Sequence, residues 1–186
     1  MSELNEIVAA MGDSESPPTT PIPREKVLRW MQSDDIEALG AVYALMADQR
    51  HHQRVDPPVL LSDSHLFLMR YYERCFLENP DGRWSSSRYE AGWDVVNWFA
   101  SLWDDRDVPR ELLHELKQWL AKLYKNGDEA LRTCLVTATL EHLFERREIA
   151  KYFEDWKKDL LLKQAYEDAL LWPEKGGDSP LGKPTT

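Results

Sequence analysis

The stretch from Asn126 to Glu145 constrains the fold more than any other part of the chain, because a helix end, a helix start and a nearly uncharged helix follow one another in it. Gly127 can adopt the left-handed backbone conformation that ends a helix. The Asp128 carboxylate can accept hydrogen bonds from the first amides of the next helix. Two helices are therefore expected to meet almost without a loop.

The second of these helices is expected to be apolar on two sides. At about 100° per residue, one side carries an apolar stripe and much of the opposite side is apolar as well. The stripe consists of Leu131, Cys134, Leu135 and Ala138, and the opposite side of Val136, Leu140, Leu143 and Phe144. A helix with two apolar sides is normally buried on both. We therefore expect this helix to lie at the centre of a helical core.

The same region resembles a known family. The anchoring residues are Gly127, Asp128, Glu129, Leu140, Glu141 and Leu143. Over roughly Glu111 to Trp172 the chain resembles an uncharacterised bacterial family of all-helical domains, whose pattern is Gly-Asp-Glu and then Leu-Glu-x-Leu. The resemblance implies a helical fold and no established activity. Because His142 stands where such patterns usually have Asn, no site residue is carried over from the family.

Helical periodicity continues along the rest of the chain, and no segment shows the sustained alternation of a strand flanked by hairpin turns. Start and stop signals delimit the expected helices at residues 24–31, 34–54, 62–77, 87–104, 109–126, 128–145, 147–157 and 159–172. The predicted class is all-α with about seven to eight helices. Short connections favour an irregular antiparallel helical bundle or a short solenoid of helical hairpins.

Four segments differ in composition. We expect a short amphipathic helix at residues 1–11 and a flexible Pro/Ser/Thr-rich linker at residues 12–23. A single helical domain is expected at residues 24–172, and a disordered tail at residues 173–186. The N-terminal helix carries apolar residues at helical spacing from Leu4 to Met11. We expect it to fold back on its own domain, and the alternative is that it docks on a partner.

Charge and cysteine content limit the function classes. The formal net charge of −10 disfavours direct binding to nucleic acid or to an anionic membrane, and it permits a basic protein partner. The two cysteines, Cys75 and Cys134, lie in apolar helical pattern and are expected to be reduced. With no secretory signal and no long apolar run, the expected location is the cytoplasm. The oligomeric state is left open.

Motifs for chemistry are lacking in the sequence. It contains no phosphate-binding loop, no dinucleotide-binding glycine pattern, no H-E-x-x-H and no G-x-S-x-G. Glu111 and His114 form one Glu-x-x-His element, but a di-iron bundle needs two. We therefore expect no catalytic residue, no metal ligand and no cofactor.

The expected helix at residues 87–104 carries the most suggestive polar pattern. Glu90, Asp94, Asn97, Ser101 and Asp104 fall on one narrow side of it, without a basic residue among them. With Asp105 directly after it and aromatic surface nearby, this acidic strip could receive a basic partner. The predicted partner-binding residues are Glu90, Asp94, Trp98, Asp104 and Asp105. The alternative is an ordinary solvated strip on a mostly buried helix.

Two hypotheses about function follow. The first is a non-catalytic cytosolic protein-interaction module, in its most specific form an immunity-like or antitoxin-like protein that binds a basic protein. The second is a small helical enzyme or ligand-binding domain with a pocket at Glu141, His142 and Glu145, since His142 is expected at the end of the Leu131 stripe between two carboxylates.

Overall fold

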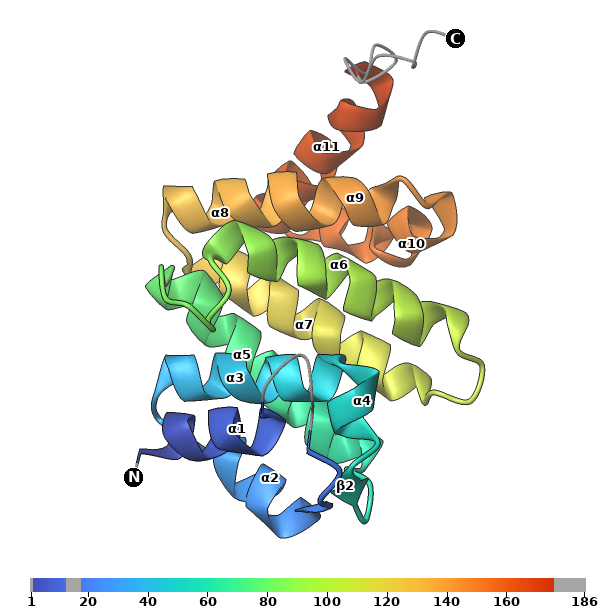
Figure 1. Cartoon of the computed structure of the whole chain (residues 1–186). Helices are drawn as coiled ribbons and strands as arrows, with labels where there is room; N and C mark the ends of the chain where they lie inside the picture. Colours follow the sequence, from blue (N-terminus) through green and yellow to red (C-terminus); the bar gives the residue numbers. More distant parts are fainter. Residues whose placement is uncertain (1, 13–17, 176–186) are drawn as a thin grey trace, which may run out of the picture. The chain divides into compact units, whose positions relative to one another are not determined.

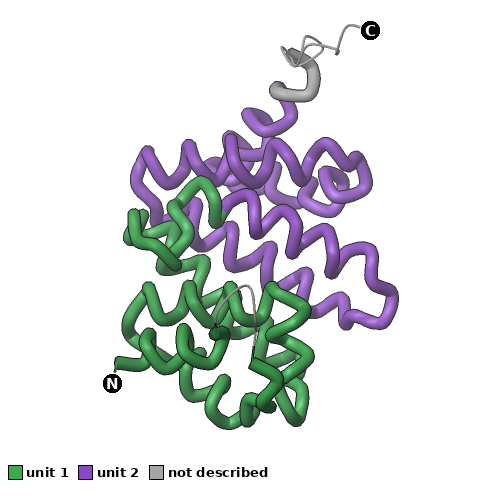
Figure 2. The backbone as a smooth tube through the Cα atoms, in the orientation of Figure 1, with its two compact units in different colours: residues 1–91 green, residues 92–186 purple. Residues whose placement is uncertain are grey.

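Helices make up most of the chain in the computed structural model, which describes residues 2–12 and 18–175 (Figure 1). The all-α class is confirmed. The chain divides into two compact units, residues 1–91 and residues 92–186, and the division falls inside one helix (Figure 2). The described part has more helical segments than expected, because the predicted helix at residues 34–54 is split in two and the one at residues 128–145 contains a π-helical turn.

Among its described residues, unit 1 contains five complete helices. They are α1 (Glu3–Met11), α2 (Arg24–Trp30), α3 (Ile36–Ala47), α4 (Gln49–His52) and α5 (Leu61–Glu78), followed by the start of α6 (Arg88–Asp104). The predicted helix at residues 34–54 breaks into α3 and α4 at Asp48, whose carboxylate accepts a hydrogen bond from the Arg50 amide at 2.8 Å. Two residues of β1 (Ile22–Pro23) pair in parallel with two residues of β2 (Val55–Asp56).

Two helix boundaries in unit 1 have a visible cause. Asp35 caps α3, because its carboxylate accepts a hydrogen bond from the Glu37 amide at 3.0 Å. Asn79 ends α5 in the left-handed conformation with φ 46°, as the sequence of turn residues after Leu77 predicts. The core of the unit is built from side chains with almost no exposed surface, including Ile7, Val27, Trp30, Leu39, Leu45, Tyr71 and Phe76.

The N-terminal helix α1 packs against α3 within its own unit. Ile7 is fully buried, and the Glu6 carboxylate accepts hydrogen bonds from the Arg29 guanidinium at 2.7 Å and from the Trp30 indole at 3.2 Å. The segment therefore folds back on its own unit. Residues 13–17 of the predicted linker lie outside the described residues, as do residues 176–186 of the predicted tail.

Unit 2 continues α6 and adds α7 (Arg110–Asn126), α8 (Glu129–Leu135), the π-helical turn η1 (Val136–Leu140), α9 (Glu141–Phe144), α10 (Arg147–Tyr152), the 3-10 turn η2 (Glu154–Lys158) and α11 (Leu160–Lys175). Consecutive helices α6, α7 and α8 reverse direction at short connections (Figure 1). Aromatic rings fill the centre of the unit, with Phe153 in contact with Phe99, Phe144 and Trp156. Helix α11 extends to Lys175, three residues into the segment predicted as tail.

The central helix of the prediction exists, and it runs without interruption through α8, η1 and α9. Its Asp128 cap is confirmed, since the carboxylate accepts a hydrogen bond from the Leu131 amide at 2.7 Å. The prediction for Gly127 is wrong, because its backbone is extended (φ −73°, ψ 154°) rather than left-handed. A side chain there would lie 2.9 Å from the Leu123 carbonyl oxygen, so close packing accounts for the glycine.

Candidate functional site

Helix α6 begins with the capping box that its sequence predicts. The Ser87 amide donates to the Glu90 carboxylate at 2.8 Å, and the Glu90 amide donates to the Ser87 hydroxyl at 3.4 Å. The Glu90 side chain is exposed, but one of its carboxylate oxygens is used in the cap. The hydrogen bonds from Ser87 lower the pKa of Glu90, so this carboxylate carries its charge at neutral pH.

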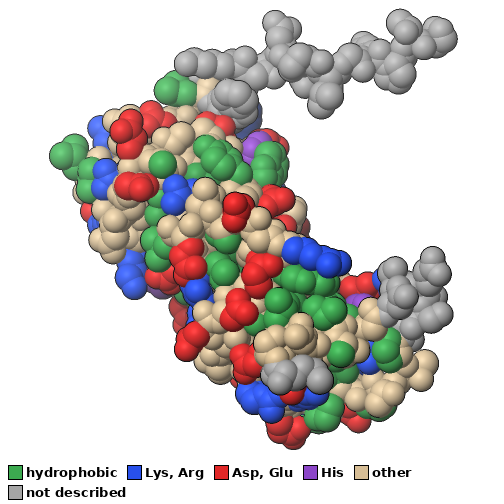
Figure 3. Space-filling view, turned by 60° about the vertical axis from the view of Figure 1, so that its left-hand side comes forward, with side chains coloured by type: hydrophobic (Ala, Val, Ile, Leu, Met, Phe, Trp, Pro, Cys, Tyr) green, Lys and Arg blue, Asp and Glu red, His purple; other side chains and the backbone are tan. Residues whose placement is uncertain are grey.

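Most of the predicted acidic strip reaches the surface. Glu90, Asn97, Ser101 and Asp104 are exposed, whereas Asp94 is half-buried. On the face that Figure 3 shows, acidic side chains lie among basic and hydrophobic ones rather than in one continuous patch. The face in that view is therefore not uniformly acidic.

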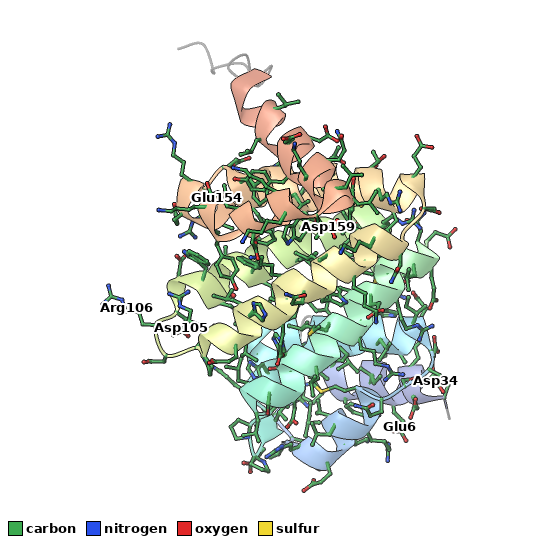
Figure 4. The ribbon with its side chains drawn as sticks, turned by 180° about the vertical axis from the view of Figure 1, so that it is seen from behind. Glu6, Asp34, Asp105, Arg106, Glu154 and Asp159 are labelled. Atoms are coloured by element: carbon green, nitrogen blue, oxygen red, sulfur yellow. The ribbon has the colours of Figure 1, made fainter. Side chains whose placement is uncertain are left out.

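The C-terminal end of the strip has a basic neighbour that comes from another segment. The Arg146 guanidinium donates to both carboxylate oxygens of Asp104, at 2.7 and 2.9 Å, and also to Glu148 at 2.9 Å. Hydrogen bonding to Arg146 lowers the pKa of Asp104. Asp105 is exposed in the loop after α6, beside Arg106 (Figure 4), and its carboxylate accepts a hydrogen bond from the Asp107 amide at 2.9 Å. Arg146 therefore neutralises part of the charge at this end.

The exposed tryptophan of α6 is Trp93 and not the predicted Trp98. Trp98 is half-buried, while the Trp93 side chain is 50 % exposed. At about 100° per residue, Trp93 lies roughly 60° from Glu90 around the helix and Trp98 roughly 80° on the other side. The sequence gives only these two angular positions. It does not reveal which side of the strip another helix covers.

Close packing between α6 and η1 holds Trp93 in place. A side chain at Gly92 would lie 2.7 Å from the Ala138 side chain, so the glycine lets the two segments approach. The Thr139 hydroxyl donates to the Gly92 carbonyl oxygen at 3.4 Å. The indole of Trp93 then stacks on the imidazole of His142, with 3.9 Å between ring centroids. Trp93 is thus an exposed aromatic side chain with one ring stacked against it.

The residues of the alternative pocket do not act together. His142 stacks on Trp93 and lies 3.0 Å from the exposed carboxylate of Glu145. Glu141 instead lines an open cavity of about 560 Å³ that includes neither His142 nor Glu145 among its lining residues. The three predicted residues therefore separate into two places.

The π-helical turn explains the separation. The Glu141 amide donates to the Val136 carbonyl, five residues earlier, so this turn holds one residue more than an α-helical turn. Every later residue is displaced around the helix by about 100°. Leu143, which is buried, consequently takes the position on the Leu131 stripe that a regular helix would give to His142.

Burial sets the acidity of Glu141. Its side chain is only 7 % exposed, and the loss of water around the carboxylate raises its pKa, an effect that the neighbouring His142 partly opposes. A buried carboxylate that carries charge is costly unless a partner compensates it. Among the described residues, no hydrogen bond or ion pair to this carboxylate is present.

Other candidate sites are accounted for within the described residues. That part of the chain brings together no group of three or more His, Cys, Asp or Glu side chains that could hold a metal ion. Glu111 and His114 are both exposed on α7. Cys75 and Cys134 are buried, and neither forms a disulfide. None of the described helices combines the length and the apolar character needed to cross a bilayer.

Comparisons of the chain with models of protein families, with characterised proteins and with solved structures give no match. The resemblance around residues 111–172 to a bacterial helical family remains a prediction from the sequence. A function must therefore be argued from the geometry of the two places described above, the surface of α6 and the cavity at Glu141.

Proposed function

We propose that this protein is a non-catalytic protein-interaction module that binds a basic protein partner through the exposed side of α6. In its most specific form it is a cytosolic immunity-like or antitoxin-like protein. The main support for this proposal is that the Trp93 indole is half exposed beside the acidic strip and stacks on His142. Tryptophan is enriched among residues that dominate binding energies at interfaces.

The arrangement supports a division of roles. The carboxylates of Glu90, Asp94 and Asp105 would steer a basic partner and speed its association. Trp93 would supply apolar surface at the centre of the contact, and it loses little conformational freedom because stacking already fixes it. Asp104 contributes less, since Arg146 already pairs with both of its carboxylate oxygens.

The test is quantitative affinity capture from native lysate at low and high salt, with wild type, Trp93→Ala and Asp94→Asn/Asp105→Asn compared in parallel. The wild type is expected to retain a basic protein at low salt and to retain less of it at high salt, because salt screens charge steering. Trp93→Ala is expected to weaken retention by at least about tenfold, which corresponds to a lost interface anchor of about 1.4 kcal/mol.

The matched controls are Leu161→Ala, which removes another exposed apolar side chain of unit 2, and Glu111→Gln/Glu167→Gln, which removes two exposed carboxylates outside α6. Both controls are expected to retain the partner as the wild type does. Equal retention by Trp93→Ala and wild type would contradict the proposal, as would a partner whose retention is unchanged by salt.

A further inference from the structure

The cavity at Glu141 lies in a different part of unit 2 from the exposed side of α6, and no residue of α6 lines it. A role for the cavity is therefore independent of the proposed protein interaction. The cavity opens between the α8–η1–α9 helix and α11. Its volume of about 560 Å³ falls within the range of sites for small molecules. Tyr124, Val136 and Asp168 contribute to its lining from three different elements.

Glu141 is the chemically unusual member of this lining. Its side chain is more than nine-tenths buried, it lines the cavity, and within the described residues no donor or cation pairs with its carboxylate. Its carboxylate oxygens are not among the buried side-chain atoms without a partner, so they reach the open space of the cavity, where a ligand can meet them. The π-helical turn that closes on the Glu141 amide also fixes the backbone at this position, and such turns often occur at functional sites.

The remaining charges of the lining favour a cation over an anion. Glu129 and Asp168 add two further carboxylates. Arg132 is the one basic residue in the lining, and its guanidinium already donates to the carbonyl oxygens of Tyr124 at 2.9 Å and Lys125 at 3.0 Å. Two of its N–H groups are thus used at the end of α7, whereas the Glu141 carboxylate forms no hydrogen bond or ion pair with a described side chain.

The geometry does not suit a metal ion. The three carboxylates of the lining are not close enough to form a ligand group, since the described residues contain no cluster of three or more candidate ligands. The lining instead combines a carboxylate with the side chain of the buried Val136 and with Thr133 and Thr137. A carboxylate next to apolar surface fits an organic cation with a short apolar part.

We propose that this cavity binds a small organic ammonium ion, with Glu141 as its counter-ion and Val136, Thr133 and Thr137 against its apolar part. The ammonium group donates to the Glu141 carboxylate in a charge-assisted hydrogen bond. Asp168 adds a second negative charge at the cavity.

The experiment is an NMR titration of the full chain with benzylamine, which is protonated at neutral pH, and with benzyl alcohol, its neutral counterpart. The resonances followed are the Val136 methyl groups and the Thr133 and Thr137 amides. Benzylamine is expected to shift these resonances in a saturable way, and benzyl alcohol is expected to bind at least about tenfold more weakly.

Two variants separate the role of Glu141 from a general effect of charge. Glu141→Gln preserves shape and removes the charge, and it is expected to weaken benzylamine binding at least about tenfold. Glu145→Gln is the matched control, because Glu145 lies one turn further on, is exposed and is not part of the cavity lining. It is expected to bind benzylamine as the wild type does, and Asp168→Asn is expected to bind a few-fold more weakly.

A pH series gives an independent readout. Since burial raises the pKa of Glu141, benzylamine binding is expected to weaken on acidification before the exposed carboxylates protonate. The proposal is overturned if benzylamine causes no saturable shift, if benzyl alcohol binds equally well, or if Glu141→Gln binds benzylamine as the wild type does. Equal shifts with calcium ions would overturn it as well, because they would indicate a metal site.

Discussion

Among single residues, Glu37 shows most directly how one side chain organises a loop. Its carboxylate accepts hydrogen bonds from the amides of Arg83, Trp84 and Ser85 at 2.9 to 3.0 Å, and another from the Ser85 hydroxyl. Burial alone would raise the pKa of Glu37, but these hydrogen bonds outweigh it and lower the pKa below the ordinary value of 4.5. The ionised carboxylate therefore holds the loop that leads into α6.

Replacing Glu37 by Gln is expected to lower the free energy of unfolding by about 2 kcal/mol, because an amide group cannot accept from all of these donors. The wild type owes part of its stability to the ionised form. That part is present above pH 4.5 and is lost as the pH falls through the lowered folded-state pKa. Urea unfolding between neutral and acidic pH measures both effects.

The control for this prediction is Glu25→Gln, at an exposed position of α2 in the same unit. It is expected to change the free energy of unfolding by less than about 0.5 kcal/mol. A Glu37→Gln variant as stable as this control would show that the loop does not depend on the carboxylate.

Trp93 and His142 show where prediction at the residue scale fails. The sequence places three tryptophans of α6 on three sides of the helix, and it cannot indicate which side another helix covers. Trp93 is exposed and Trp98 is half-buried because of neighbours that are distant in the chain. His142 does not lie on the apolar stripe where it was predicted, because one π-helical turn precedes it. Such a turn has no signature in the apolar pattern.

At the scale of elements, the boundaries with polar caps were predictable and the internal irregularities were not. Asp128, the Ser87–Glu90 box and Asn79 act locally, so a few adjacent residues determine their roles. The break at Asp48 has a local cap that the prediction missed, and the π-helical turn has no signature in the apolar pattern. Gly127 illustrates the limit, since glycine also occurs where a neighbour leaves no room for a side chain.

Helix α3 offers a prediction at this scale. A side chain at Gly40 would lie 2.2 Å from the Trp84 carbonyl oxygen, a backbone atom that cannot move easily. Gly40→Ala is therefore expected to lower the free energy of unfolding by about 1–3 kcal/mol. Helix propensity alone predicts the opposite sign, a gain of up to about 1 kcal/mol. Thermal or urea unfolding of the full chain distinguishes the two signs.

Ala47→Gly, at an exposed position of the same helix, serves as the comparison. It is expected to lower stability by no more than about 1 kcal/mol, in line with helix propensity. If Gly40→Ala stabilised the protein, the close approach of Trp84 to α3 would not limit this position.

At the scale of the whole molecule, charge is the property that the sequence fixes most directly. The formal net charge of −10 is independent of how the chain folds. The protein is therefore expected to pass through immobilised heparin, a polyanion, at low salt and to be retained by an anion exchanger. Retention on heparin at low salt would contradict the charge argument and would indicate a local basic surface.

The sequence by itself determined the all-α class, the N-terminal caps at Ser87 and Asp128 and the acidic character, because these depend on periodicity, local hydrogen bonding and composition. Only the tertiary structure decided which tryptophan is exposed, that Arg146 neutralises Asp104, and that Glu141 rather than His142 lines a cavity. Each of these depends on contacts between residues far apart in the chain or on a change of helical register. Neither is encoded in the pattern of a single helix.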